Sequence, residues 1–301
     1  MTTSSAQSSE YYDLHTFGFG YINDFRLVTP KKGKPFHSCR IRALRGPRDN
    51  VKYTFFDTII PCKKVLELLE QCGDAAKEKA GNRVLIAFTV GDTYAEAFSH
   101  KGKMCCGQKG RLINIRMLKL DGNKIYPEST DTDRSVTDDR TVETFEIITR
   151  GIGYANRYYT YTSSEGESIN FCSISALQGR RDEPEYTKFM ATVNDDHITG
   201  LLEQCEDAFN EKRQIFISFN IKDLYPNMFE YKSGDRQGET GCNNRGVLSK
   251  IGLIMIDKHQ VYPALQADEP ETPSPENPAP EMPPMAPKKP RTASRPQSAM
   301  A

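Results

Sequence analysis

The segment GFGYINDFR, which begins at Gly18, recurs as GIGYANRYY from Gly151. The same offset then pairs 59 positions without a gap, through Ala76 and Phe209, and 23 of these positions are identical. The pentapeptide LLEQC returns unchanged within this stretch. An ungapped match of this length indicates an internal duplication, so we predict two copies of one domain.

The copies span residues 10–127 and 143–263, and the segments around them differ in composition. The segment 128–142 is polar and acidic, which is typical of a linker. The segment 264–301 is rich in proline and poor in large apolar residues, so we expect it to be disordered, as we expect of residues 1–9.

Several classes of protein are disfavoured by composition. The longest apolar runs, VLIAF and IGLIMI, are far shorter than the roughly 20 residues of a membrane-spanning helix. The start, MTTSSAQSSEYYD, has no basic and apolar signal region, so we expect a cytoplasmic protein with no membrane partner. The eight cysteines show no C-x-x-C spacing, and we expect reduced thiols, no metal and no cofactor. No catalytic constellation stands out, so we do not expect an enzyme.

Each copy shows one order of elements. In the first copy, runs of aromatic and β-branched residues predict five strands, at 17–27, 36–44, 52–60, 83–90 and 111–120. Apolar residues from Val65 to Ala76 recur at intervals of three and four, which predicts one helix that ends by Gly81. The glycine- and lysine-rich segment 91–110 is typical of a protruding hairpin. The predicted order is β-β-β-α-β-β.

This order is that of the OB-fold, a five-stranded, partly open barrel that binds oligonucleotides on its second and third strands and on two of its loops. We therefore predict a mainly β protein with one helix per domain and two tandem OB-fold-like barrels. An open antiparallel sheet covered by one helix would show the same pattern, so the pattern leaves closure of the barrel open.

The two copies differ in charge although the whole chain is neutral. Residues 10–127 hold 21 basic and 12 acidic side chains, whereas residues 143–263 hold 13 basic and 18 acidic ones. Phosphate contacts supply most non-specific affinity for nucleic acid, so the first copy is the better candidate for a nucleic-acid surface.

Eight cations of the first copy have no cationic counterpart in the second. They lie on or between the first three predicted strands: Arg26, Lys31, Lys32, Lys34, Arg40, Arg42, Arg45 and Lys52. Within the second strand they alternate with Cys39, Ile41 and Ala43, which both copies share. We therefore expect a common core and a divergent exposed surface.

Aromatic residues accompany these cations. Phe36 and Phe55, together with Tyr94 and Phe98 of the hairpin, could stack on bases. Tyr53 and Phe56 have aromatic counterparts in the second copy, so we expect them in the core instead. Two hairpin lysines, which could follow a phosphate backbone, complete the candidate site: Lys101 and Lys103.

The motifs YIN, GKPF, ALRG, YTFFD, LLEQC and RVLIAF resemble a family found on integrative and conjugative elements, whose members are usually labelled element replication proteins. More distantly, the chain is similar to bacterial single-stranded DNA-binding proteins, which have a glycine-marked first strand, a G-x-x-F turn and an aromatic third strand. The tandem duplication and the final SAMA depart from those patterns. The resemblance implies a role in replication or conjugative transfer, with replication or transfer proteins as partners.

The leading hypothesis is non-enzymatic binding of single-stranded DNA, mainly by the first copy. An alternative is a protein–protein adaptor that works through the acidic second copy, and RNA binding is a close variant. Whether the chain forms a homo-oligomer is left open.

Overall fold

A computed structural model describes residues 10–127, 142–162 and 166–263. The expectations of disorder for 1–9 and 264–301, and nearly all of the expected linker, lie outside the described residues. Both copies fall within a single compact unit. Within the described ranges no helix has the length and apolarity needed to cross a membrane.

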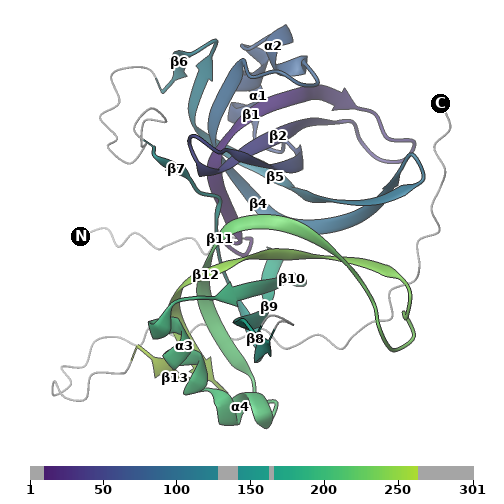
Figure 1. The fold of residues 1–301 in the computed structure, drawn as a ribbon. Helices are drawn as coiled ribbons and strands as arrows, with labels where there is room; N and C mark the ends of the chain where they lie inside the picture. Colours follow the sequence, from purple (N-terminus) through teal and green to yellow (C-terminus); the bar gives the residue numbers. More distant parts are fainter. Residues whose placement is uncertain (1–9, 128–141, 163–165, 264–301) are drawn as a thin grey trace. The chain divides into compact units, whose positions relative to one another are not determined.

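The five strands expected in the first copy are present, four of them longer than predicted (Figure 1). They are β1 (His15–Val28), β2 (Phe36–Pro47), β3 (Lys52–Ile59), β4 (Val84–His100) and β5 (Lys103–Leu120). The segment expected to form a protruding hairpin between the fourth and fifth strands is the continuous extension of β4 and β5, which pair as far as His100 and Lys103.

Strand pairing closes the first barrel. The strand β1 is antiparallel to both β2 and β4, β2 is antiparallel to β3, and β5 is antiparallel to β4. A parallel pairing of β3 with β5 completes the ring. The order β1-β2-β3-β5-β4 returns to β1, which is the closed arrangement of an OB-type barrel and removes the open-sheet alternative.

The second copy repeats this ring. Its strands are β8 (Ile148–Thr162), β9 (Ser168–Arg180), β10 (Glu183–Val193), β11 (Ile215–Glu230) and β12 (Thr240–Ile256). Four antiparallel pairings and a parallel one between β10 and β12 close it in the same order. Three short strands lie outside the rings: β6 (Asn123–Tyr126), β7 (Thr144–Phe145) and β13 (His259–Tyr262).

The helical segment predicted in each copy is present, but it is divided into two short helices. The first copy has α1 (Lys63–Glu70) and α2 (Asp74–Lys77), and the second has α3 (Asp196–Glu203) and α4 (Glu206–Asn210). In the first copy the break falls at Gly73, whose φ of 54° is outside the helical region. The second of these helices, α2, ends at Lys77 and stops short of Gly81. The backbone oxygen of Gly81 accepts a hydrogen bond from the side chain of Asn23.

The two interiors use the same residues, as the alternation in the second strand predicts. Cys39, Ile41 and Ala43 are buried, and so are their counterparts in β9. The rings of Phe56 and Phe88 lie 5.8 Å apart, and the equivalent pair of the second copy lies 5.9 Å apart. Burial of these apolar side chains supplies the main stabilisation of each barrel.

The copies join through a short antiparallel pairing of β1 with β8, centred on Thr16 and Thr149. The hydroxyls of these threonines are 3.0 Å apart, and the two residues are equivalent positions of the duplication. A second equivalent pair also meets, because Gln108 Nε2 donates to Asn244 Oδ1 over 2.9 Å. Contacts between equivalent residues indicate a pseudo-twofold relation between the copies.

Each copy also packs its leading segment against the other. The backbone N–H of Tyr12 donates to the oxygen of Gly179, and β7 pairs with β2 at Gly46. The guanidinium of Arg181 lies 5.2 Å from the ring of Tyr12, and that of Arg48 lies 5.9 Å from Phe145. These exchanged segments tie the two barrels together.

Candidate nucleic-acid interface

The outer face of the first barrel is set by strand register. Because side chains alternate along a strand, the residues between Cys39, Ile41 and Ala43 point away from the core. Across the sheet Arg42 pairs with Tyr21 on β1 and with Phe55 on β3. We call the surface formed by Tyr21, Arg42, Tyr53 and Phe55 the first face.

Arg42 is the centre of the first face. Its Cζ lies 4.8 Å from the ring centroid of Tyr53 and 5.5 Å from that of Tyr21. Within the described part of the chain no carboxylate pairs with it, and its Nε is buried without a hydrogen-bond partner. The guanidinium is therefore held in place by aromatic rings while its charge stays uncompensated.

Aromatic side chains on this face are open to solvent. Phe55 is 50% exposed and Tyr53 is 41% exposed, while Phe56, the next residue along the strand, is fully buried. The expectation that Tyr53 belongs to the core was therefore wrong, because an aromatic residue kept in both copies need not face inward. Phe36, at the start of β2, is 38% exposed. Exposed rings beside a cation form a stacking platform.

Two of the predicted cations are compensated by carboxylates. Arg40 Nε lies 2.8 Å from Asp57 Oδ1, directly across β2 and β3. Arg26 forms an ion pair with Asp24. Their charges are less available to a phosphate than a charge count suggests.

The loop between β1 and β2 carries Lys31, Lys32 and Lys34, all exposed. None of the three has an ion-pair partner in the part of the chain that the structure describes. Because the loop leads directly to Phe36, these charges lie at the start of β2, the strand that carries Arg42. Such lysines suit contacts to a phosphate backbone.

Two further predicted residues belong to the junction with the second copy. The Cζ of Arg45 lies 5.0 Å from the ring of Tyr225 on β11, and Lys52 pairs with Arg45 in the register of β2 and β3. The neighbouring Thr54 donates a hydrogen bond to the oxygen of Leu224 over 3.1 Å. The structure thus places Arg45 against the other barrel, with the exposed Lys52 opposite it on β3.

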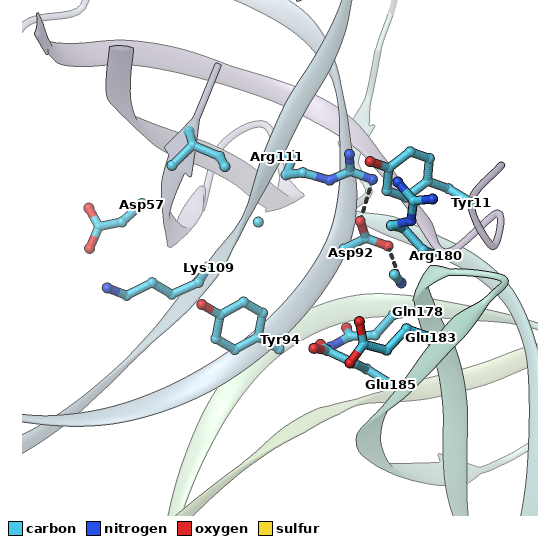
Figure 2. A pocket seen from close by; sticks show the side chains of 13 residues that line it. Tyr11, Asp57, Asp92, Tyr94, Lys109, Arg111, Gln178, Arg180, Glu183 and Glu185 are labelled. Carbon is cyan, nitrogen blue, oxygen red and sulfur yellow. Dashed lines mark hydrogen bonds and ion pairs between the residues drawn. The ribbon is translucent and has the colours of Figure 1, made fainter. Parts of the chain in front are cut away.

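The hairpin residues are not gathered with the first face as a group. Tyr94 lines a cavity of about 390 Å³ between β5 and the β9–β10 turn (Figure 2). Phe98 is 38% exposed further along the hairpin, and Lys101 and Lys103 lie exposed at its tip. Burial, and then the charges of Glu96 and Glu185, raise the pKa of Tyr94.

The cations that line this cavity are compensated. Figure 2 shows Arg111 paired with Asp92, whose carboxylate also accepts a hydrogen bond from the Gly179 N–H over 2.9 Å. Lys109 Nζ lies 3.1 Å from Glu96; burial opposes its charge, but the hydrogen bond to Glu96 together with the negative charges of Glu96 and Asp57 raises the pKa of Lys109. With exposed Glu183 and Glu185 on its rim, the cavity does not suit a polyanion.

The second copy carries a different row at the same register. The row Arg40, Asp57, Lys109, Tyr94 of the first barrel corresponds to Ser173, Met190, Arg245, Tyr225. Arg245 lies 5.3 Å from the ring of Phe171 and has no carboxylate partner among the described residues. This arginine could not be predicted from the net charge of each copy, because net charge does not show which cations are paired.

The cysteines are free thiols, four buried and four partly buried. Burial raises the pKa of Cys39 and of Cys172 to about 12. In the described ranges no group of three or more histidine, cysteine, aspartate or glutamate side chains is arranged to hold a metal ion.

The sequence profile of the family DUF3577, described as a protein of unknown function, matches residues 5–134 and again residues 139–270. The chain belongs to this family, and the two matches coincide with the duplication. No curated protein matches the sequence.

Similar solved structures include a deletion mutant of the single-stranded DNA binding protein from Thermus aquaticus. It is 10% identical, with a TM-score of 0.41, over 86% of this chain and 97% of that one. The wild-type form is 8% identical, with a TM-score of 0.39, over 79% and 91%. Because both TM-scores are below 0.5, the assignment of the two barrels rests on the strand pairing described above.

Proposed function

We propose that this protein binds single-stranded DNA without catalysing a reaction, and that the first face is its main contact surface. The observation that carries the proposal is the uncompensated guanidinium of Arg42, held between two tyrosine rings beside the half-exposed Phe55. Bases can stack on such rings, at about 1–3 kcal/mol per base, while the cation attracts phosphate. The loop lysines extend the positive surface.

A single strand fits this surface better than a duplex does. Stacking on Tyr53 or Phe55 requires an unpaired base with an accessible face, which paired bases inside a helix do not offer. Binding should show little sequence preference, because every base has such a face. A role in replication or conjugative transfer of a mobile element, in the cytoplasm and with replication or transfer proteins as partners, is part of the proposal and is supported by the sequence resemblance alone.

The test uses the full chain, because the two barrels share strand pairing and exchanged segments. Fluorescence anisotropy with a labelled oligothymidine should show salt-dependent binding, and an unlabelled duplex should compete poorly. Arg42→Ser introduces the residue that the second copy has at this position. If that variant binds with unchanged affinity and salt dependence, the first face is not the contact surface.

The adaptor function remains a second candidate because exposed carboxylates gather at the rim of the cavity, on Glu183 and Glu185. It predicts no binding of oligothymidine and requires a partner with a basic surface. Oligouridine in the same assay tests RNA binding, since equal affinity for both strands would show that the sugar is not read.

A further inference from the structure

Three side chains meet where β1 pairs with β8. The Cζ of Arg116, from β5, lies 5.5 Å from the ring centroid of Phe17, and the Cζ of Arg150, from β8, lies 5.3 Å from the same centroid. We call Phe17, Arg116 and Arg150 the junction cluster. It combines one arginine from each copy, so it exists only because the two barrels are joined.

The alternation of side chains fixes which side of the junction carries the cluster. Thr16 and Thr149 are buried, bonded to each other, and Thr16 also meets Thr93 over 3.0 Å. Neighbouring residues on a strand point to opposite sides, so Phe17 and Arg150 face away from these threonines. Arg150 is exposed, which leaves the cluster open to a ligand.

A β-bulge presents Arg116. Its neighbours Ile115 and Met117 pair with two consecutive residues of β4, so Arg116 is the extra residue of the strand. Bulges of this kind redirect a side chain. The second copy has the same irregularity in β12, but Gly252 stands at the equivalent position. The bulge therefore belongs to the shared scaffold, whereas the guanidinium is specific to the first copy.

The cluster holds two positive charges and no negative one. Neither Arg116 nor Arg150 has a carboxylate partner among the described residues. Burial, and then the positive charge of Arg150, lower the pKa of Arg116. The Nε of Arg116 is buried without a hydrogen-bond partner. An anion would accept a hydrogen bond from this buried Nε–H group and would offset the repulsion between the two arginines.

We propose that Arg116 and Arg150 form a phosphate-binding site that takes a backbone phosphate of the bound strand, an inference that rests on the proposed single-stranded DNA binding. Phosphate matches the donors present, because a guanidinium offers paired N–H groups to two phosphate oxygens. A phosphate also removes the repulsion between the two cations. The ring of Phe17, which lies near both guanidiniums, helps to orient them.

The test compares the double variant Arg116→Gln/Arg150→Gln with a control, Lys79→Gln/Lys212→Gln, which also removes one exposed cation from each copy. Oligothymidine affinity is measured by anisotropy over a salt series. One lost phosphate contact should make the slope of log affinity against log salt shallower by about 0.7 and weaken binding roughly fivefold at low salt. The control should keep both values. An unchanged slope in the double variant, with circular dichroism like that of the wild type, overturns the site while the proposed function stands.

A second arm distinguishes the source of the phosphate. Thermal unfolding is followed with and without inorganic tripolyphosphate. If the wild type binds oligothymidine and tripolyphosphate competes with it at the junction cluster, this supports the proposal that the cluster binds a phosphate of the DNA backbone. If tripolyphosphate stabilises the wild type but not the double variant, and no oligothymidine binds, the proposed function fails and the cluster takes a free phosphate compound instead. A wild type that responds to neither ligand overturns the phosphate site itself.

Discussion

The same row of four strand positions differs in the two barrels in how its cations are paired. In the first barrel, the basic one by count, Arg40 and Lys109 are each paired with a carboxylate. In the second, the acidic one by count, Arg245 has no carboxylate partner among the described residues and lies over Phe171. The free charge of the first barrel is instead held by Arg42 and the loop lysines.

The net charge of a domain is therefore a poor guide to where a polyanion would bind. The two charges of an ion pair neutralise each other. Attraction of a polyanion therefore depends on the cations that have no carboxylate partner in the folded protein. Acidic residues of the second copy concentrate on its helical segment and on the turn near Glu183, away from Arg245 in the sequence. The following experiments test the contrast between the copies.

The largest effect on oligothymidine binding is expected when the loop between β1 and β2 receives the residues of the second copy, in Lys31→Ser/Lys32→Glu/Lys34→Glu. Loss of three phosphate contacts should make the salt slope shallower by about 2 and weaken oligothymidine binding roughly a hundredfold at low salt. A triple control, Lys63→Glu/Lys79→Glu/Lys124→Glu, changes exposed lysines elsewhere in the same copy. Equal losses in the two variants would mean that general charge, not the loop, determines binding.

Removing the rings of the first face, in Tyr53→Ala/Phe55→Ala, should weaken binding by about 2 kcal/mol, roughly thirtyfold, because bases lose their stacking partners. Anisotropy measures the loss. A comparison variant in the second copy is Tyr161→Ala, which removes a ring that is 55% exposed. A loss as large for Tyr161→Ala would show that the contact surface is not confined to the first face.

Arg42 and Arg40 lie on the same strand and differ in whether a carboxylate pairs with them. We expect Arg42→Ser to weaken oligothymidine binding about tenfold and Arg40→Ser by less than about threefold, because Asp57 already neutralises Arg40. Both affinities come from the same titration, with circular dichroism as the check on folding. The reverse order would show that Asp57 releases Arg40 to the nucleic acid.

The junction should make the barrels unfold together. Gln108→Ala removes the hydrogen bond to Asn244 and should lower the free energy of unfolding by about 1 kcal/mol. Urea titration followed by circular dichroism should keep one transition with a lower midpoint. Gln237→Ala, at an exposed position, is the control. Two separate transitions, with only one of them shifted, would show that the copies are independent.

The smallest difference between the two copies is expected in the reactivity of their buried core cysteines. Cys39 and Cys172 are buried, and burial raises the pKa of each to about 12. At pH 8 both remain protonated, so iodoacetamide should leave them unmodified in the native protein while it reacts with the partly buried Cys62. Peptide mass spectrometry detects the modification. Labelling of only one of the two would show that one barrel opens more readily.

Much of the fold could be predicted from the sequence. Repetition located the two copies, and alternation along the second strand identified Cys39, Ile41 and Ala43 as core. The pattern could not show that the helix breaks at Gly73, because its apolar spacing continues across the break. It also placed Tyr53 inside, since an aromatic residue common to both copies fits a core and an exposed platform equally well.

The candidate site was predicted only in part. Composition located the loop lysines and Arg42, which the structure leaves without carboxylate partners in the described residues. Arg40 and Arg26 were grouped with them because no sequence pattern shows that Asp57 and Asp24 lie within reach. Arg116 and Arg150 were not singled out, since 34 positions separate them in the chain.

By itself, then, the sequence determined the duplication, the order of elements and the residues that fill each barrel, because these follow from local periodicity and from direct self-similarity. Only the tertiary structure decided that the barrels close, that they join through Thr16 and Thr149, and which cations keep a free charge. Those properties depend on distances between residues far apart in the chain. Electrostatic energy falls with distance in space and not with separation in sequence.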